Sequence, residues 1–476
     1  MYKKLASHTL IYGLSPYIPR ILGLFILPII TKDLTDFDYG VYGIILAYIT
    51  AIEVLKDLGL NLILYNSFTK MPHQYKWMWR SIYGFLTIWN LVYAILAIGL
   101  IYIAVPAEAR DNVWLIAVLN VLPIVFFGPT AVLGKIFFQM KEMPVQIAVR
   151  TIIFGILTIL LNLYTISYLK LGYMGWFWTT CIVGFITNLS FWYPINIKYN
   201  LRPILNFKRR LLKKSLKVSL PTVPHYYSNY IIQSSDKVIL NVLNIGPGDI
   251  GGYNFAGMFG GYFSQLGNAL GQAARPLFNL YYKEENYIKI REIIYAMQLF
   301  FFTITFLVAI WLKEIFIILV NNKTLAATYP MAIILIMAIN YRPMYFGAIG
   351  VIIYNEKTKS LLKITFIGSL LSVILNFIFI PIIGIWAAVF STYISMMYLG
   401  YSGYYLKEFN RVNVKFYPVL WLLATIGLTF CAFFIVEFDV MYKFIISIFL
   451  IIIVFFVLRK IKRLKISKIF LKKGIK

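Results

Sequence analysis

The sequence predicts an all-α fold, a polytopic bundle of about 14 transmembrane helices. Two observations predict this class. Of the 476 residues, 61% are hydrophobic and 13% are charged, whereas a soluble domain is about 45–50% apolar and about 25% charged. Apolar runs of about 18 residues or more also recur along the chain, and each is long enough to cross the bilayer as a helix. Lipid must therefore cover most of the surface.

Each predicted span is an apolar segment of sufficient length bounded by polar or charged residues. We predict spans at about 10–30, 41–64, 81–105, 113–138, 145–169, 173–195, 216–243, 250–278, 292–312, 329–354, 361–383, 385–405, 416–436 and 441–458.

The basic residues give an independent test of these spans. The chain carries 45 Lys and Arg against 18 Asp and Glu, a net charge of +27. Most of the basic residues fall in alternate connections and in both tails, which places both termini in the cytoplasm. This pattern accounts for the charge, so no nucleic-acid partner is expected. Cys181 and Cys431 both fall inside predicted spans, so neither a disulfide nor a metal site is expected.

A repeat divides the chain. The Asp-x-Gly-x-Tyr pattern of Asp38–Tyr42 returns at Asp249–Tyr253, 211 residues later, and Gly172 and Thr180 return as Gly384 and Thr392, 212 residues later. Six spans is an even number, so the two lobes form a parallel repeat with the cargo path in a central cavity between them. The predicted parts are an N-terminal lobe 1–195, a basic cytoplasmic linker 196–217, a C-terminal lobe 218–405, two additional helices in 406–458 and a basic cytoplasmic tail 459–476.

Three stretches resemble a known family. The segments Asp38–Tyr42 and Asp249–Tyr253, Ser219–Lys237, and Asn376–Thr392 are similar to polysaccharide flippases of the multidrug/oligosaccharidyl-lipid/polysaccharide exporter superfamily. The resemblance implies a protein of the bacterial inner (plasma) membrane that moves an undecaprenyl-diphosphate-linked oligosaccharide from the cytoplasmic to the outer leaflet by alternating access. O-antigen, capsule, teichoic-type polymer and peptidoglycan precursors all remain open as cargo. Membrane lipids and other polysaccharide-assembly membrane proteins are the expected partners.

Charged side chains inside the spans are the candidate site. A charge at the bilayer centre costs about 2.5–3.5 kcal/mol on insertion scales, so it usually faces a partner or a wet cavity. Guanidinium groups match phosphate oxygens in a bidentate way. We therefore predict a substrate-binding set that neutralises the diphosphate. Its members are Arg20, Lys56, Lys237, Arg275 and Arg342.

One member of this set depends on the resemblance. Arg275 lies near a cytoplasmic end, where it could extend to the lipid headgroups instead, as we expect for Arg150. The resemblance implies a cavity-facing basic residue in the eighth span, and Arg275 is that residue here.

Three acids inside the predicted spans could serve energy coupling. Glu53, Asp57 and Asp236 are candidates to bind a coupling cation, with a proton or sodium gradient as the energy source and no cofactor. The alternative is a structural ion pair, such as Glu53 with Lys56 three residues later on the same helix.

Two other functions are alternatives. A cation-coupled multidrug exporter of the same superfamily would need an acidic cavity for its cationic cargo. A membrane-embedded polysaccharide polymerase or glycosyltransferase would need catalytic groups outside the membrane, but the longest predicted outside connection, 313–328, holds one acid, Glu314. The sequence also has no nucleotide-binding loop. A transporter, and not an enzyme, is therefore expected.

Overall fold

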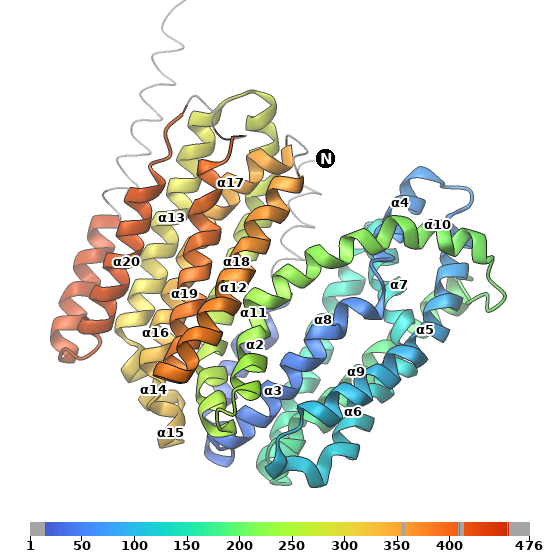
Figure 1. Ribbon diagram of the computed structural model, residues 1–476, viewed down its shortest axis with the longest axis horizontal. Coiled ribbons are helices and arrows are strands. Elements are labelled where there is room, and N and C mark those ends of the chain that lie inside the picture. The colour runs from blue at the N-terminus through green and yellow to red at the C-terminus, as the bar shows by residue number, and fades with distance from the viewer. Residues whose placement is uncertain (1–14, 355–357, 408, 410–413, 455, 457–476) are drawn as a thin grey trace, which may run out of the picture. The chain divides into compact units, whose positions relative to one another are not determined.

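The computed structural model describes residues 15–354, 358–407, 409, 414–454 and 456 (Figure 1). Throughout these residues the regular structure is helical, and no strand occurs in them. The predicted all-α class is confirmed. Six of the described helices are long and apolar enough to cross a membrane, and a bent pair makes a seventh. The total of fourteen spans stays a prediction.

The first half of the chain forms mainly α-helices, with 3₁₀ turns η1, η2 and η5 and π-helical segments η3 and η4 between them. In chain order they are α2 Tyr17–Asp33, α3 Asp36–Glu53, η1 Val54–Lys56, α4 Asn61–Lys70, α5 Tyr75–Ala104, η2 Ala107–Asn112, α6 Val113–Val125, α7 Gly128–Met140, α8 Pro144–Asn162, η3 Leu163–Tyr168, α9 Met174–Tyr193, η4 Pro194–Lys198, α10 Arg209–Ser219, η5 Leu220–Thr222 and α11 Val223–Val242.

The second half continues in the same way. Its elements are α12 Pro247–Lys283, α13 Tyr287–Ile310, α14 Leu312–Leu319, α15 Lys323–Ala326, α16 Tyr329–Ala338, η6 Ile339–Tyr341, α17 Arg342–Tyr354, α18 Thr358–Ile383, α19 Ile385–Tyr401, η7 Ser402–Tyr405, α20 Pro418–Ile435 and a last described helix, Val440–Val454.

The second predicted span is broken, so the expectation of one continuous helix over 41–64 is wrong. Leu58 and Gly59 take left-handed backbone conformations, with φ of 51° and 70°. The Asp57 carboxylate accepts the Gly59 N–H at 3.0 Å and also accepts from the Asn61 side chain. A side chain that bonds its own nearby backbone competes with the helix, so α3 stops and α4 starts again after the turn.

The fourth predicted span is also bent. The segments Ala107–Val125 and Gly128–Met140 meet at 46°. Phe127 has a left-handed φ of 65°, and Pro129 follows at the start of α7. Pro123 lies inside α6 and removes one of its backbone hydrogen bonds. The apolar run therefore crosses as two helices joined by a corner.

The helices form two compact units. Unit 1 comprises residues up to 255 with 318–328 and 365–392, and unit 2 comprises 256–317, 329–364 and the residues from 393 onward. The helices α12, α18 and α19 each contribute residues to both. These units differ in extent from the lobes predicted from the repeat, and the division at 196–217 stays a prediction.

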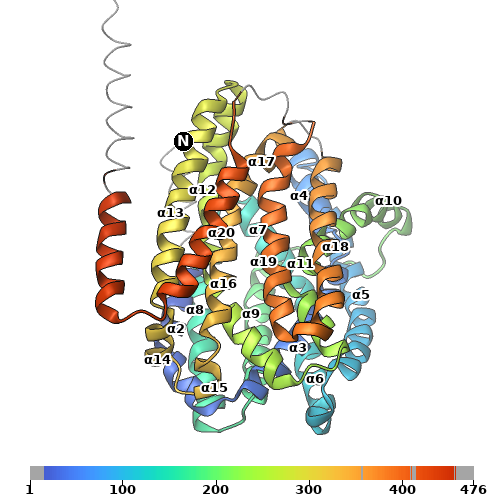
Figure 2. The ribbon, with the colours of Figure 1, turned by 60° about the vertical axis from the view of Figure 1, so that its left-hand side comes forward.

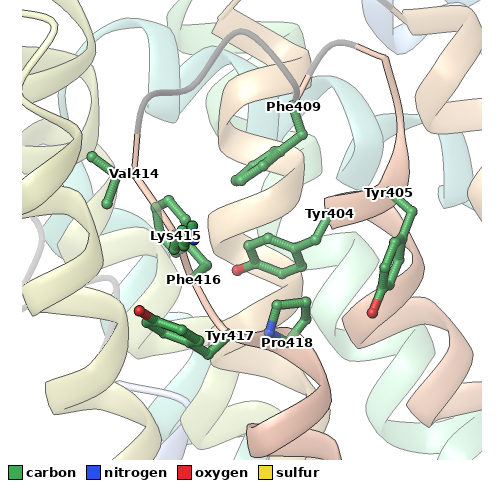
Figure 3. A pocket seen from close by; sticks show the side chains of 8 residues that line it. All are labelled: Tyr404, Tyr405, Phe409, Val414, Lys415, Phe416, Tyr417 and Pro418. Carbon is green, nitrogen blue, oxygen red and sulfur yellow. The ribbon is translucent and has the colours of Figure 1, made fainter.

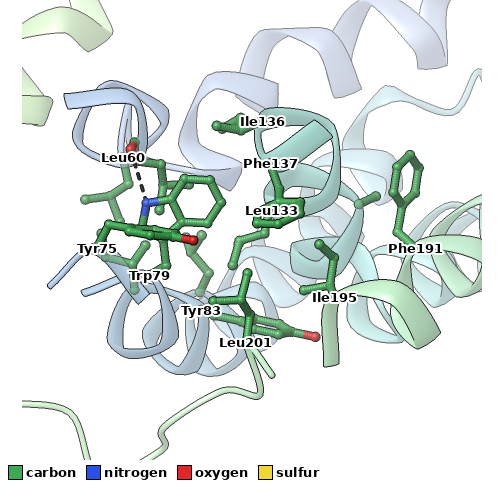
Figure 4. Packing of buried hydrophobic residues seen from close by; sticks show 14 of the residues in the cluster. Leu60, Tyr75, Trp79, Tyr83, Leu133, Ile136, Phe137, Phe191, Ile195 and Leu201 are labelled. Atoms are coloured by element: carbon green, nitrogen blue, oxygen red, sulfur yellow. Dashed lines mark hydrogen bonds between the residues drawn. The ribbon is translucent and has the colours of Figure 1, made fainter. Parts of the chain in front are cut away.

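Unit 1 has an aromatic core between α4, α5, α7 and α9 (Figure 4). Trp79 is fully buried in it, and its indole N–H donates to the carbonyl of Leu64 at 3.1 Å and to the Ser67 hydroxyl at 3.0 Å. Figure 4 shows Leu133 and Phe137 of α7 beside this indole ring. A buried indole needs such acceptors, because an unpaired N–H is costly away from water.

In unit 2, α13 packs against α16, α17 and α20 (Figure 2). The last described helix is held by an ion pair between Lys443, whose side chain is fully buried, and Glu314 at 2.6 Å. The Trp311 indole also donates to Ser447 of that helix at 2.9 Å.

Both units expose large apolar side chains, as a lipid-covered surface requires. On α5, Ile95 and Ile103 are 71% and 70% exposed, and on α20 Leu420 is 65% exposed.

Candidate functional site

Arg342 is a buried guanidinium with no acidic partner among the described residues. Its Nη1 donates to the Asn268 amide oxygen and its Nη2 to the Ser264 hydroxyl, both at 2.5 Å. Its Nε is buried and makes no hydrogen bond, and the residue is 7% exposed. Neutral acceptors satisfy two donors and the Tyr341 ring lies 5.6 Å from the Arg342 Cζ, but no counter-ion neutralises the positive charge among the described residues. The arrangement is therefore suited to an anion.

The backbone around Arg342 positions this group. Pro343 lacks an N–H and cannot continue the hydrogen bonding of α16, so the helix passes through the 3₁₀ turn η6 before α17 starts at Arg342. On α12, Gly267 allows the Arg342 side chain to lie close, because a methyl group there would come within 2.5 Å of the Arg342 Cδ. The site thus depends on one proline and one glycine.

Arg20, like Arg342, has no acidic partner within 4.0 Å among the described residues. It lies in α2, half-buried, with its Cζ 6.0 Å from the centre of the Tyr17 ring. Its Nη1 is buried and has no hydrogen-bond partner. Pro19, the residue before it, packs against Gly155 where α2 contacts α8. Arg20 therefore also retains an uncompensated charge.

Lys56 lies at the break in the second predicted span, at the end of η1. It interacts electrostatically with Glu53, Lys135 and Asp57, but it makes no ion pair within 4.0 Å in the described part of the chain. Glu53 is exposed, and Asp57 has its two local partners at the turn. Asp57 thus stabilises the break, and its predicted coupling role stays a prediction.

Asp236 and Lys237 follow each other on α11. Asp236 is 4% exposed and accepts from the Tyr253 hydroxyl, which itself lies 3.2 Å from the Thr392 hydroxyl. Its other oxygen accepts the Lys237 backbone N–H at 2.8 Å. Lys237 is half-buried and interacts electrostatically with Asp236.

Within unit 1, α11 packs against α3 and η1, so the helices that carry Asp236, Lys237 and Lys56 are neighbours. Arg20 lies on α2, which packs against α8 and η3. Arg342 belongs to unit 2. Arg275 lies in α12, but its side chain is outside the described part of the structure. Whether the five basic residues share one cavity stays a prediction.

Sequence reasoning missed the neutral partners of the charged groups. Ser264 and Asn268 are four residues apart on α12 and therefore share a face. That polar pair inside a predicted span was the available signal, although α12 carries other polar residues as well. Tyr253 and Thr392 were identified as repeat positions, but nothing in the spacing indicated that they would meet at Asp236.

A separate pocket in unit 2 has aromatic walls (Figure 3). The Tyr404 hydroxyl donates to the Met344 carbonyl at 2.8 Å, and Figure 3 shows the Tyr404 ring between Phe409 and Pro418. None of the predicted substrate-binding residues lines this pocket. Its lining is Tyr404, Tyr405, Phe409, Val414, Lys415, Phe416, Tyr417 and Pro418.

Known structures share the fold. The chain is similar to a lipid II flippase MurJ in an inward closed conformation, with 15% identity, a TM-score of 0.73, and coverage of 96% of this chain and 99% of that one. It is also similar to a multidrug resistance MATE family transporter of the MOP superfamily. The inward-facing form has 14% identity and a TM-score of 0.64, and the outward-facing form 15% and 0.57; each covers 88% of this chain and 96% of the other. At such identities the likeness concerns the fold.

Sequence comparison gives the family. A search of curated proteins finds no match. The family model for polysaccharide biosynthesis proteins matches residues 5–281, more than half of the chain. The fold expected from the resemblance, that of the multidrug/oligosaccharidyl-lipid/polysaccharide exporters, is confirmed. The chain is a membrane protein with a transporter fold and belongs to the polysaccharide biosynthesis protein family.

Proposed function

We propose that this chain is a flippase that moves an undecaprenyl-diphosphate-linked oligosaccharide from the cytoplasmic to the outer leaflet of the bacterial inner membrane. Both termini are cytoplasmic in this proposal, and the cargo is a repeat unit of a surface polysaccharide. Other membrane proteins of polysaccharide assembly supply and receive it. The polysaccharide biosynthesis family and the likeness to a lipid II flippase support a lipid-linked cargo.

The observation that carries the proposal is the uncompensated charge of Arg342. Its guanidinium is buried among neutral acceptors, and its Nε–H has no hydrogen-bond partner. A buried charge left without a counter-ion is costly, and the cost falls when an anion arrives. A diphosphate that crosses the hydrocarbon core needs a positive charge to neutralise it. Arg20, with its own unpaired Nη1, offers a second such group, and Lys56, Lys237 and Arg275 complete the proposed set.

Alternating access requires a part of the bundle that closes. Close backbone approach occurs where α3 meets the start of α12, at Gly40 and Gly251. The charge pattern puts this crossing on the outer side of the membrane. In the proposed cycle, α3 and α12 are in contact while the cavity faces the cytoplasm, and they separate to release the cargo outward.

We assign coupling to Asp236, with Glu53 and Asp57 as further candidates. A proton or a sodium ion bound at the Asp236 carboxylate would compete with the Tyr253 hydroxyl for the same oxygen. A gradient would then favour one conformation over the other, because the ion binds the two conformations with different affinities.

Deletion of the gene tests the function. Lipid-linked oligosaccharide should accumulate in the cytoplasmic leaflet. In the complemented strain, Arg342→Ala and Arg20→Ala should each slow export about 10- to 100-fold, the loss of one charge-assisted hydrogen bond to phosphate. Arg342→Lys should restore part of the rate, because the charge returns without the fork geometry.

Arg150→Ala is the matched control. Arg150 is also an arginine of a membrane-spanning helix, but its guanidinium lies over the Phe138 and Phe191 rings and bonds Gln146 and Ser190. Export should stay at the wild-type rate in this variant. Wild-type export by both Arg342→Ala and Arg20→Ala would refute phosphate matching. Unchanged oligosaccharide with raised drug sensitivity in the deletion strain would favour the multidrug exporter.

A further inference from the structure

The segment predicted to be a basic connection contains a helix. This helix, α10, presents two different faces. Leu212 and Ser215 are buried, and Leu216 packs against the aromatic core of unit 1. The basic side chains of the helix are exposed: Arg209, Arg210, Lys213, Lys214 and Lys217. A basic amphipathic helix of this kind is typical of a membrane surface.

A groove runs between α10, α4 and the start of α5. Its volume is about 260 Å³, and most of its lining is apolar, with Lys214 at α10 as its charged member. The lining residues are Ile63, Met71, Gln74, Trp77, Met78, Leu211, Lys214, Ser215 and Val218. A site with an apolar interior and one ammonium group is complementary to an anionic amphiphile.

Ser215 points to a ligand independently of the charges. It lines the groove, it is 3% exposed, and its hydroxyl is buried without a hydrogen-bond partner. A buried hydroxyl with no partner is costly, so native proteins rarely leave one unsatisfied. Lys214 is its neighbour in sequence and lines the same groove. The two side chains could therefore hold one phosphate between them.

Three apolar side chains of the groove lining are themselves exposed. Trp77, Met71 and Val218 are 42%, 48% and 51% exposed. The ammonium group of Lys208 lies 5.6 Å from the centre of the Trp77 ring. A tryptophan next to lysines is typical of the boundary between lipid headgroups and hydrocarbon. The charge pattern of the chain puts this boundary at the cytoplasmic leaflet, where anionic lipids attract basic residues.

We propose that this groove binds an anionic phospholipid of the cytoplasmic leaflet. The acyl chain lies along Ile63, Trp77 and Met78, and the headgroup phosphate accepts hydrogen bonds from Lys214 and Ser215. The remaining basic residues of α10 raise the local concentration of anionic lipid. The bound lipid fixes α10 against α4 and the aromatic core. None of the groove residues belongs to the proposed substrate-binding set, so this proposal stands whether or not the chain is a flippase.

Quenching of Trp77 tests the site in the full-length purified protein. Phosphatidylglycerol with brominated acyl chains should quench part of the tryptophan fluorescence, and that part should be missing in Trp77→Phe. Lys214→Gln and Ser215→Ala should each raise the lipid concentration needed for half-quenching about fivefold. Brominated phosphatidylcholine should quench Trp77 much less, because it carries no net negative charge.

Lys217→Gln is the matched control, because Lys217 is an exposed lysine of the same helix that does not line the groove. It should shift half-quenching by less than Lys214→Gln. Equal quenching by the two brominated lipids, or equal shifts for Lys214→Gln and Lys217→Gln, would overturn the proposal. Displacement of phosphatidylglycerol by an equal concentration of inorganic phosphate would reduce the groove to a simple anion site. Lys214-dependent binding of an acidic protein without quenching would assign the surface to that protein instead.

Discussion

Gly40 of α3 and Gly251 of α12 lie against each other at equivalent positions of the repeat. A methyl group on Gly251 would come within 2.7 Å of the Gly40 backbone nitrogen and would also collide with the Asp36 carbonyl. A methyl group on Gly40 would collide with the Pro247 carbonyl. Asp36 and Pro247 are separated by the same 211 residues as the two glycines. The contact is therefore reciprocal, as a two-fold related pair of helices requires.

Adding one methyl group at this crossing should be costly. Gly40→Ala and Gly251→Ala should each destabilise the protein by about 1–3 kcal/mol, because the opposing atoms belong to the backbone and cannot rotate away. The two losses should be similar, since the contact is reciprocal. Thermal unfolding of the purified protein measures both. Gly99→Ala in α5 is the control, because nothing lies within 4 Å of its added methyl group, and it should be neutral or stabilising by up to about 1 kcal/mol. If Gly40→Ala and Gly251→Ala changed stability no more than Gly99→Ala does, the close backbone contact between α3 and α12 would be contradicted.

Gly267→Ala should impair export while leaving every charge in place. The new methyl group would come within 2.5 Å of the Arg342 Cδ and 3.2 Å of the Phe301 ring, so the guanidinium must leave Asn268 and Ser264. We expect export to fall about tenfold with little loss of inserted protein. Gly261→Ala, on the same helix with open space around it, should export as wild type. Equal export rates for Gly267→Ala and Gly261→Ala would show that export does not require the Arg342 guanidinium beside Asn268 and Ser264.

Two tyrosines of the repeat allow a comparison of matched hydrogen bonds. Tyr42 bonds Thr180, and Tyr253 lies at the equivalent Thr392 but also donates to Asp236. Tyr42→Phe should cost about 1 kcal/mol of stability and Tyr253→Phe about 1.5–3 kcal/mol, because the second acceptor is a carboxylate. Denaturation of both variants in the same detergent measures the difference. Equal losses of stability for Tyr42→Phe and Tyr253→Phe would mean that the hydrogen bond from Tyr253 to Asp236 does not stabilise the protein.

Two ion pairs of unit 2 differ in burial, and their removal should differ in cost. Glu314→Gln leaves the fully buried Lys443 without its counter-ion and should destabilise by about 3–5 kcal/mol. Glu437→Gln removes the partner of Lys313 from a pair that is 37% and 53% exposed and should cost less than about 1 kcal/mol. The double change Glu314→Leu with Lys443→Met should recover most of the first loss. Failure to recover it would mean that the pair itself, and not the stranded charge, stabilises the C-terminal helix.

The exposed pair should also make stability depend weakly on pH. The hydrogen bonds from Lys313 and Tyr329 hold the pKa of the Glu437 carboxyl below its usual value. The unfolded chain then binds this proton first as the solution is acidified. The stabilisation is complete above the unfolded pKa of about 4.3 and is lost as pH falls through the lower folded pKa. Melting temperatures of wild type and Glu437→Gln should therefore converge below about pH 4, whereas parallel curves would contradict this role.

The sequence predicted the class because hydropathy and charge add up along the chain, and it predicted the family because three short stretches resemble that family. Hydropathy predicts a span, and the basic residues predict its orientation, at many places along the chain. A wrong boundary at one span therefore does not change the predicted class. The breaks were missed because each depends on a local competition, such as the Asp57 carboxylate taking the Gly59 N–H. The helix α10 was missed because its basic residues give it the composition of a connection.

The candidate site was predicted only in part. Arg342 and Arg20 could be identified because an unpaired charge in a span is visible in the sequence. The side chains around them could not be predicted, because Asn268 and Ser264 lie more than 70 residues from Arg342 in the sequence and meet it only in the folded chain. The repeat also shares a contact that its sequence did not indicate. Ser391 donates to Asn376, and at the equivalent place in the first half the Thr179 and Thr165 hydroxyls lie 3.2 Å apart.

The turn after Glu53 divides one transmembrane passage into two mechanically different pieces. On one side, Leu60 and Leu64 are fully buried in the aromatic core and cannot shift without opening it. On the other, α3 meets α11 and the start of α12. The α-helical hydrogen bonding is interrupted at Leu58 and Gly59, whose backbones are left-handed, so we expect a tilt of α3 to be transmitted only weakly to α4. Lys56 lies at this break, so its ammonium group would change its depth in the membrane whenever α3 tilts.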